Sequence, residues 1–204
     1  MLREAFKICN ALNNKERYKE FNDKIIHIVV EDIANTDNAW DNEKFQRNCI
    51  DRGIKQLELD DQDIIMISDC DEIPDANMLS KLKEQNVFLN EIYSLRMEMY
   101  YYNLTCKMEY WYHAKILPYL IYKQINKPED IRTKLYIEKF ILEGGWHLSY
   151  FGNVEYNKKE YLDDDKIKEC IENCSDLFFR EGEKIIKVKI EDNDYLPKNY
   201  ELLL

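Results

Sequence analysis

An apolar run that ends in a cluster of acidic residues constrains this sequence more than any other feature. Ile64-Ile65-Met66-Ile67 is short, continuous and rich in β-branched side chains, which predicts a buried strand. The acidic stretch Ser68-Asp69-Cys70-Asp71-Glu72-Ile73-Pro74 follows at once. Pro74 suits the first turn of a helix, which we expect at about residues 75–85. Because ligands of open α/β sheets bind beyond the carboxyl ends of strands, this turn is the first candidate site.

Strand and helix patterns continue along the rest of the chain. The β-branched run at residues 25–30 predicts a second buried strand, and residues 41–59 carry apolar side chains at helical spacing. The later segments comprise a Tyr-, Met- and Leu-rich region of strands (91–122), a polar connection (126–130), a helix (164–174) and an edge strand (184–190). We therefore expect one α/β domain over residues 1–204, with a mixed sheet flanked by helices.

Charge and cysteine usage narrow the class of protein. The 204 residues include 40 acidic and 29 basic side chains, a formal charge of −11, which disfavours nucleic-acid binding as the main role. The chain contains neither an apolar run long enough to span a bilayer nor a signal-peptide start. Its six cysteines are scattered without a C-x-x-C pair, which fits reduced thiols better than a disulfide framework. These features predict a cytoplasmic protein with no membrane span.

The acidic turn has the composition of a cation site. Asp69 and Asp71 stand at i and i+2, so in an extended chain their carboxylates point to the same side. Two such carboxylates and the oxygens of a nucleoside diphosphate are ligands that a hard divalent cation accepts. The cation would act as a Lewis acid on a departing diphosphate. The alternative is an acidic turn that only caps the next helix.

Two further segments carry candidate residues. Gly144-Gly145-Trp146-His147 combines glycines that permit close backbone approach with a stacking face for a sugar and an imidazole able to bind a proton or a metal. Core packing is the alternative for this segment. Gln46 and Arg47 lie on the polar border of the predicted helix, where the guanidinium could bind phosphate or simply be solvated or salt-bridged.

Taken together, the chain from about residue 15 resembles glycosyltransferase family 17, whose members add a bisecting N-acetylglucosamine to N-glycans. The resemblance is carried by several motifs in the family's order. These are Trp40 with Glu43, Gln46 and Arg47, the run Asp63–Pro74, Tyr101-Tyr102-Asn103-Leu104, the run Gly145–Gly152, and Asp176-Leu177-Phe178.

The resemblance implies a GT-A-like fold and an inverting transfer of N-acetylglucosamine from UDP-GlcNAc to a glycan hydroxyl, with a divalent metal such as Mn²⁺. It implies a donor and metal half over residues 1–90 and a β-rich acceptor half over residues 91–204. Family members begin with two further strands, so we also expect an exposed sheet edge through which the chain could oligomerise. The implied roles are metal ligands (Asp69, Asp71), donor or sugar contacts (Gln46, Arg47, Gly145, Trp146) and catalytic groups (Glu72, Glu143, His147).

Two other functions remain open on the sequence. One is a degenerate transferase that no longer catalyses and binds a sugar or a protein, which metal-dependent binding of a nucleotide sugar would distinguish from an enzyme. The other is a phosphohydrolase with Asp69 as nucleophile. That reaction needs Thr or Ser two residues after the second Asp, where this chain has Ile73.

Overall fold

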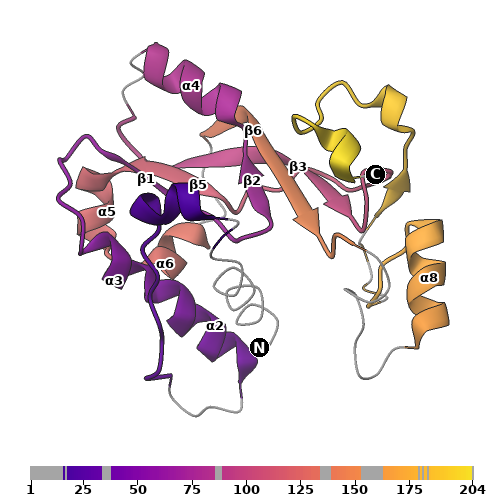
Figure 1. Ribbon diagram of the computed structural model, residues 1–204, viewed down its shortest axis with the longest axis horizontal. Coiled ribbons are helices and arrows are strands. Elements are labelled where there is room, and N and C mark those ends of the chain that lie inside the picture. The colour runs from indigo at the N-terminus through magenta and orange to yellow at the C-terminus, as the bar shows by residue number, and fades with distance from the viewer. Residues whose placement is uncertain are drawn as a thin grey trace.

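The computed structural model describes residues 16, 18–33, 38–85, 89–133, 139–152, 163–178, 180, 182 and 184–203. Within these residues the chain forms a curled seven-stranded sheet with helices around it (Figure 1). The strands are β1 (Ile64–Ile67), β2 (Glu72–Pro74), β3 (Tyr93–Tyr101), β4 (Cys106–Lys107), β5 (Lys115–Pro118), β6 (Phe140–Ser149) and β7 (Ile186–Lys187). Their order is β1-β5-β3-β4-β7, and β6 pairs with both β2 and β3.

The sheet is mixed, because β3 and β6 run parallel and the other pairs are antiparallel. A mixed α/β fold is therefore confirmed. In the register of β2 with β6, Glu72 lies opposite His147. This pairing joins the end of the acidic turn to the segment Gly144–His147, which we call the glycine-rich motif, although 75 residues separate Glu72 from His147 in the chain.

The helices match the predicted segments in part. They are α2 (Ala39–Asn48), α3 (Ile50–Ile54), α4 (Ala76–Glu84), α5 (Tyr119–Ile125), α6 (Pro128–Arg132) and α8 (Asp164–Asn173). The helices expected at 75–85 and 164–174 are confirmed as α4 and α8. Asp75 caps α4 by accepting from the Asn77 N–H at 2.8 Å, so Pro74 ends β2 rather than opening the helix.

The single helix predicted over residues 41–59 is wrong in extent. It is divided at Cys49, whose N–H contacts the carbonyls of both Phe45 and Gln46 at 3.1 Å, a tightening typical of a helix end. The second piece ends at Ile54, immediately after Gly53, a residue of low helix propensity.

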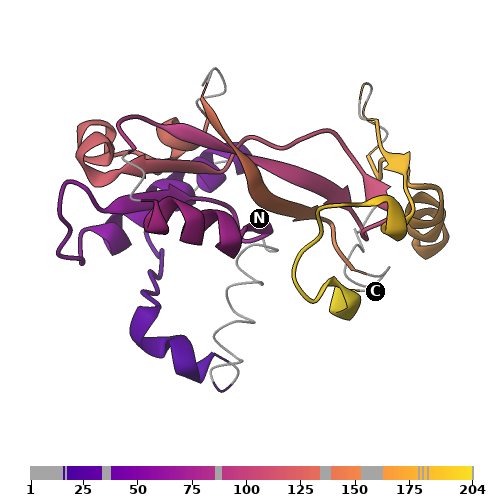
Figure 2. The same cartoon turned by 90° about the horizontal axis from the view of Figure 1, so that it is seen from above.

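The buried strand predicted at residues 25–30 is also wrong. The segment is extended, but it forms no strand ladder with the described residues and is mostly exposed, with Val29 61% accessible. A β-branched run becomes a strand only where a neighbouring strand pairs with it. Figure 2 shows the preceding 3₁₀ helix η1 (Lys19–Lys24) standing away from the sheet.

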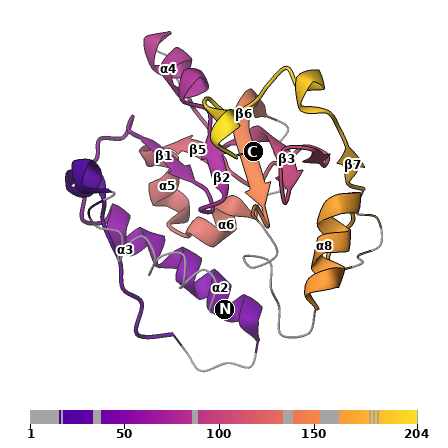
Figure 3. The ribbon, with the colours of Figure 1, turned by 45° about the vertical axis from the view of Figure 1, so that its right-hand side comes forward.

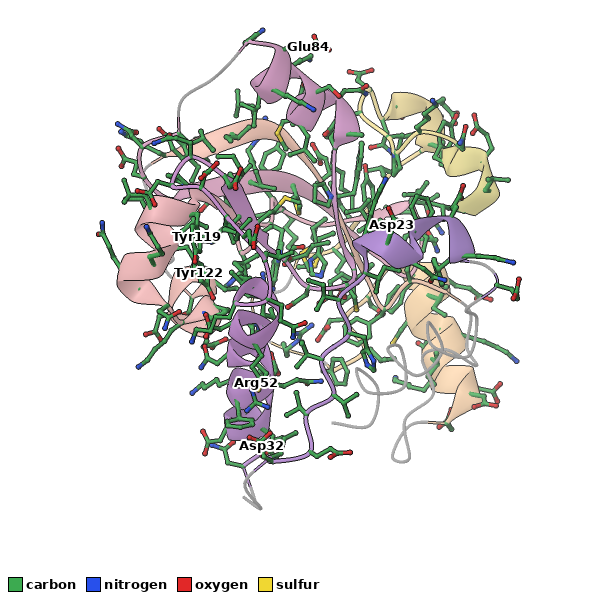
Figure 4. All side chains as sticks on the ribbon, turned by 60° about the vertical axis from the view of Figure 1, so that its left-hand side comes forward. Asp23, Asp32, Arg52, Glu84, Tyr119 and Tyr122 are labelled. Atoms are coloured by element: carbon green, nitrogen blue, oxygen red, sulfur yellow. A yellow bond between two sulfur atoms is a disulfide. The ribbon has the colours of Figure 1, made fainter. Side chains whose placement is uncertain are left out.

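Contacts with α3 hold this N-terminal segment in place. A Cβ on Gly53 would lie 3.5 Å from a carbon of Ile28 and 3.7 Å from one of Ile26, so these side chains pack over the glycine. Beyond them, Asp32 and Arg52 form a two-pronged ion pair with N–O distances of 2.8 and 2.7 Å (Figure 4). The Arg52 hydrogen bond lowers the pKa of Asp32.

The prediction of reduced cysteines is wrong for one pair. Cys106 on β4 and Cys174 at the end of α8 form a disulfide across a sequence separation of 68 residues. Both sulfurs lie in a core cluster that also contains Cys170 and joins α8 to the sheet. Cysteine spacing along the chain carries no signal for a pair that only the fold brings together.

The C-terminal residues 190–203, which we call the strap, lie across one side of β6 (Figure 3). The strap contains the 3₁₀ helices η2 (Ile190–Asp192) and η3 (Tyr200–Leu203). Tyr195 stacks on Trp146, with ring centroids 4.7 Å apart, and the Trp146 indole donates to the Tyr195 carbonyl at 3.2 Å. The strap therefore covers the tryptophan of the glycine-rich motif.

Two expectations concern membranes and self-association. None of the helices among the described residues has the length and apolar character needed to cross a bilayer. β1 pairs with β5 along one edge, and no described strand pairs with its other edge. Oligomerisation through that edge stays a prediction.

Candidate active site

A buried ion pair between Arg132 and Glu72 forms the base of the site. The guanidinium binds both carboxylate oxygens, at 3.0 and 2.7 Å. The Glu72 side chain is fully buried and also accepts from the indole N–H of Trp111 and, at 2.8 Å, from the backbone N–H of Asp69. Four donors thus satisfy this carboxylate, as a buried charge requires.

Asp69 binds two guanidinium groups. Its Oδ2 accepts from Arg132 Nη2 at 2.5 Å and from Arg47 Nη2 at 3.4 Å. The chain turns after it, because the Glu72 N–H donates back to the Asp69 carbonyl at 3.1 Å. Asp69 and Asp71 therefore do not lie on one side of an extended segment as predicted, and Asp69 is held by arginines from α2 and α6.

Arg47 lies at the centre of a carboxylate cluster. Besides Asp69, its guanidinium contacts Glu43 at 2.7 Å and Glu129 of α6. Burial favours the neutral form, but the hydrogen bonds and charges of these three carboxylates outweigh it and raise the pKa of Arg47 above its ordinary value. Arg47 is therefore a permanent cation in the site.

Asp71 faces His147 across the β2–β6 pair. The distance from Asp71 Oδ2 to His147 Nε2 is 3.6 Å, and the backbone carbonyl of Asp71 accepts from the Leu148 N–H at 2.8 Å. His147 is buried, and its Nδ1 has no hydrogen-bond partner among the described residues. Most buried polar atoms in native proteins are hydrogen-bonded, so this nitrogen calls for a partner such as a bound water, an ion or a ligand.

Trp111 and His113, from the segment before β5, and Lys115, the first residue of β5, form one wall of the site. The Trp111 ring lies between His113 and His147, with centroid distances of 4.3 and 4.4 Å. Burial, followed by the charges of Arg132 and Lys115, lowers the pKa of His113 to about 4, so this ring is neutral. Lys115 is fully buried and donates to the carbonyls of Tyr112 and, at 3.1 Å, His113.

The donor set at Asp71 and His147 fits a divalent cation only with help from a ligand. One carboxylate oxygen and one imidazole nitrogen 3.6 Å apart can bind the same ion, since metal–ligand bonds of this kind are about 2.0–2.2 Å long. No group of three His, Cys, Asp or Glu among the described residues could hold a metal alone. Oxygens of a bound diphosphate would therefore have to complete the shell.

A cavity of about 520 Å³ lies beside Asp69 and Arg47. It separates the extended N-terminal segment from α2, α3 and the loop that follows β1. Its polar lining includes Lys24, His27, Glu43, Gln46 and Arg47, and most of the remaining lining is aliphatic. The lining also includes Ile26, Ile28, Val30, Ile50, Ile54, Leu57, Ser68, Asp69 and Cys70. The predicted donor residues Gln46 and Arg47 are thus brought together with Asp69.

The structure does not place Trp146 beside His147 in one subsite. Neighbouring side chains of a strand point to opposite sides, and Trp146 packs under the strap while His147 faces Asp71. Gly145 has a φ of +130°, and a Cβ there would lie 2.1 Å from the Ile73 carbonyl oxygen. Its backbone approach to β2 explains the glycine without a ligand.

The two glutamates predicted as bases lie in unsuitable surroundings. Glu72 has four donors and no exposed surface, which disfavours proton transfer to or from substrate. The Glu143 side chain is 61% exposed and lies 3.9 Å from Lys81, at the other end of the β2–β6 pair from His147. Of the three predicted catalytic residues, only His147 lies against the acidic turn with a ring nitrogen that has no hydrogen-bond partner among the described residues.

Sequence reasoning missed Arg132, Glu129 and Trp111. The first two belong to α6, which begins within the polar connection predicted at residues 126–130 and extends two residues beyond it. Pro128 at the first helical position and two acidic residues in the first turn are a helix-start signal that could have revealed α6. Nothing local indicates that Arg132 would reach Glu72, 60 residues earlier.

Comparison with models of known protein families shows that one family covers the motifs described above. The model of Glycosyltransferase family 17 matches residues 5–184, which include the acidic turn, α6 and the glycine-rich motif and end before the strap. Comparison with curated proteins gave no match, and comparison with solved structures gave none.

Proposed function

Because the chain belongs to glycosyltransferase family 17, we propose that it transfers N-acetylglucosamine from UDP-GlcNAc to a hydroxyl of a glycan, with inversion at the anomeric carbon and with Mn²⁺, on a GT-A-like fold. Family membership supports the general activity, a glycosyl transfer from a sugar donor to an acceptor. The observation that carries the finer proposal is the pairing of Asp71 with His147, because Asp71 directly follows Cys70, which lines the cavity together with Arg47.

Charge explains why the proposed donor needs a cation. The carboxylates of the network outnumber its guanidiniums. Four of them, Glu43, Asp69, Glu72 and Glu129, bind Arg47 or Arg132, and Asp71 lies beside His147. A diphosphate entering this surrounding would be repelled. Mn²⁺ bound by Asp71 and His147 would neutralise the charge that develops on the departing diphosphate.

In this proposal, the other residues of the site bind and orient the sugar donor. We assign Arg47, with Gln46 beside it, to the diphosphate, since its permanent charge lines the cavity. The aliphatic walls suit the flat base of a nucleoside. Asp69 acts as a positioning residue in this proposal: it holds Arg47 and Arg132 in place instead of binding the metal.

Release of UDP in the presence of an acceptor tests the proposal. The purified chain is incubated with UDP-GlcNAc, Mn²⁺ and a biantennary N-glycan, and NMR of the product establishes the anomeric configuration. We expect UDP and a β-linked product, both lost on addition of a chelator and in Asp71→Ala. Asp165→Asn, which changes a carboxylate on the exposed side of α8, is the matched control. A folded chain that neither binds donor nor releases UDP would instead be a non-catalytic binding module.

A further inference from the structure

One side chain, that of Trp111, contacts both the buried ion pair and the histidine of the candidate metal site. Its indole Nε1 donates to the Glu72 carboxylate. Its ring lies against the His147 ring, with centroids 4.4 Å apart and planes inclined by 35°. Glu72 and His147 lie opposite each other in the β2–β6 pair. The indole therefore reaches both strands that carry the site.

Trp111 is held at its backbone, at its indole nitrogen and at its ring. Its backbone N–H and C=O form hydrogen bonds of 2.9 Å with the C=O and N–H of Met97. The acceptor of its indole N–H, Glu72, is fully buried and is bound by Arg132 at 3.0 and 2.7 Å. The His113 ring also packs on the indole, at a centroid distance of 4.3 Å. These contacts give the indole a single orientation.

His147 lacks the contact that normally orients a metal-binding histidine. In metal sites, the ring nitrogen that does not bind the ion usually donates to a carboxylate or a carbonyl, and this bond fixes the orientation of the ring. The Nε2 of His147 faces Asp71 at 3.6 Å, whereas Nδ1 has no hydrogen-bond partner among the described residues. The orientation of this buried imidazole therefore depends on packing, and Trp111 supplies a ring that packs on it.

We propose that Trp111 is a positioning residue, which holds the His147 imidazole with Nε2 directed toward Asp71. The inference rests on the proposed function, which supplies a cation between these two side chains. Two ligands 3.6 Å apart accept one ion only while both stay in place, and binding sites of this kind need their geometry held within about 0.5 Å. The fixed indole supplies that constraint in place of the missing hydrogen bond.

The alternative is that Trp111 only fills space. Its ring packs against two core clusters, one that contains Met99 and one that contains Leu95. A residue that only fills space would affect stability and leave the orientation of the imidazole unchanged. NMR of the histidine rings distinguishes the two roles, because it reports orientation directly and does not require catalysis.

The chain has three histidines, so their ring signals can be assigned by substituting each in turn. The exposed His27 serves as an internal reference. Trp111→Leu removes the stacked ring, and Trp111→Phe keeps a ring but removes the donor to Glu72. Without metal, we expect narrow His147 signals shifted by the indole ring current in the wild-type chain. In Trp111→Leu these signals should broaden or split and move toward those of His27, with Trp111→Phe in between.

Mn²⁺ gives a second measurement on the same samples. It is titrated into the chain with UDP, a diphosphate that carries no sugar to transfer, and paramagnetic broadening of the His147 signals reports the affinity. We expect Mn²⁺ to bind at least about tenfold more weakly to Trp111→Leu, as is usual when a metal-binding histidine loses the group that orients it. Trp111→Phe should again lie in between.

Trp146→Phe is the matched control. It also removes one indole hydrogen bond, the one to the Tyr195 carbonyl at 3.2 Å, from the chain neighbour of His147 on the other side of β6. The His147 signals and the Mn²⁺ affinity of this variant should equal those of the wild-type chain.

Wild-type His147 signals in a folded Trp111→Leu, or an Mn²⁺ affinity within twofold of wild type, would overturn the positioning role. If Trp111→Leu does not fold, Trp111→Phe decides, and no change in either measurement there overturns the role as well. A wild-type chain that binds no Mn²⁺ with UDP rejects the proposed enzyme, while loss of the single His147 orientation in Trp111→Leu still supports the role. Equal Mn²⁺ binding by wild type and Trp111→Leu retains the enzyme and rejects the role.

Discussion

The two sides of β6 differ in what holds them together. On the site side, His147 faces Asp71 and stacks on Trp111, which binds Glu72 of the buried ion pair with Arg132. Burial of such charges opposes folding unless they are paired. On the strap side, Trp146 is sealed under Tyr195 by stacking and one hydrogen bond. Two adjacent residues of one motif thus belong to different structures, one suited to chemistry and the other to packing. The following four predictions test that division.

Breaking the buried ion pair between Arg132 and Glu72 should lower the free energy of unfolding more than any other substitution below. Arg132→Met leaves the Glu72 carboxylate buried without its main partner, and we expect a loss of about 3–5 kcal/mol in the free energy of unfolding, measured by urea denaturation. The double variant Arg132→Met/Glu72→Leu removes both charges and should recover most of that loss. A single variant as stable as the wild-type chain would show that the site side is not held by this pair.

Substituting each neighbour on β6 separates packing from chemistry. Trp146→Ala should lower the free energy of unfolding by about 3 kcal/mol, because it empties the space under the strap. Metal-dependent binding of UDP-GlcNAc by the folded fraction should persist. His147→Ala should do the reverse, with a smaller loss of stability and no such binding. Equal effects of the two variants on donor binding would contradict the division.

The buried Lys115 of the site side should make the free energy of unfolding depend on pH. Burial, followed by repulsion from Arg132, lowers the pKa of Lys115 to about 8 from an ordinary value of 10.5. Between these values the unfolded chain binds a proton that the native chain lacks, so stability should rise with pH, by less than about 1.4 kcal/mol per pH unit. Chemical denaturation at pH 8 to 10 measures it. Lys115→Met should flatten the rise, whereas Lys184→Met, outside the site, should leave it.

The strap should respond mildly to loss of one hydroxyl. The Tyr195 OH lies 2.9 Å from Asp75 Oδ2 and 2.7 Å from the Glu143 carbonyl, and burial together with Asp75 raises its pKa, so it remains a donor. Tyr195→Phe keeps the stack on Trp146 and should cost about 1 kcal/mol in thermal or urea unfolding. Donor binding should not change. A variant that unfolds like wild type would mean that stacking alone holds the strap.

Local patterns predicted the elements that stabilise themselves through burial and capping. The apolar run became the strand β1, but it is only half-buried, since Ile65 and Ile67 are buried while Ile64 and Met66 are exposed. The helices α4 and α8 begin after Asp75 and Asp163, each of which caps its helix. The segment at residues 25–30 is as rich in β-branched residues as β1, but no described strand pairs with it, and composition does not report the presence of a partner.

The site was predictable only in part, because it depends on contacts distant in sequence. The acidic turn and Arg47 were singled out from the sequence, but it contained no sign that Arg132 of α6 would bind Asp69. The separation of Trp146 from His147 follows from strand alternation alone once β6 is known to be a strand. The Cys106–Cys174 bridge had no local signal.

The central claim is that Asp71 and His147, and not Asp69, hold the cation that binds the donor. Calorimetric titration of UDP-GlcNAc, with and without Mn²⁺, into the wild-type chain and three variants tests it most directly. We predict Mn²⁺-dependent binding that is lost in Asp71→Ala and His147→Ala and persists, at most about tenfold weaker, in Asp69→Asn. Full binding by the first two variants together with loss in Asp69→Asn would contradict the account.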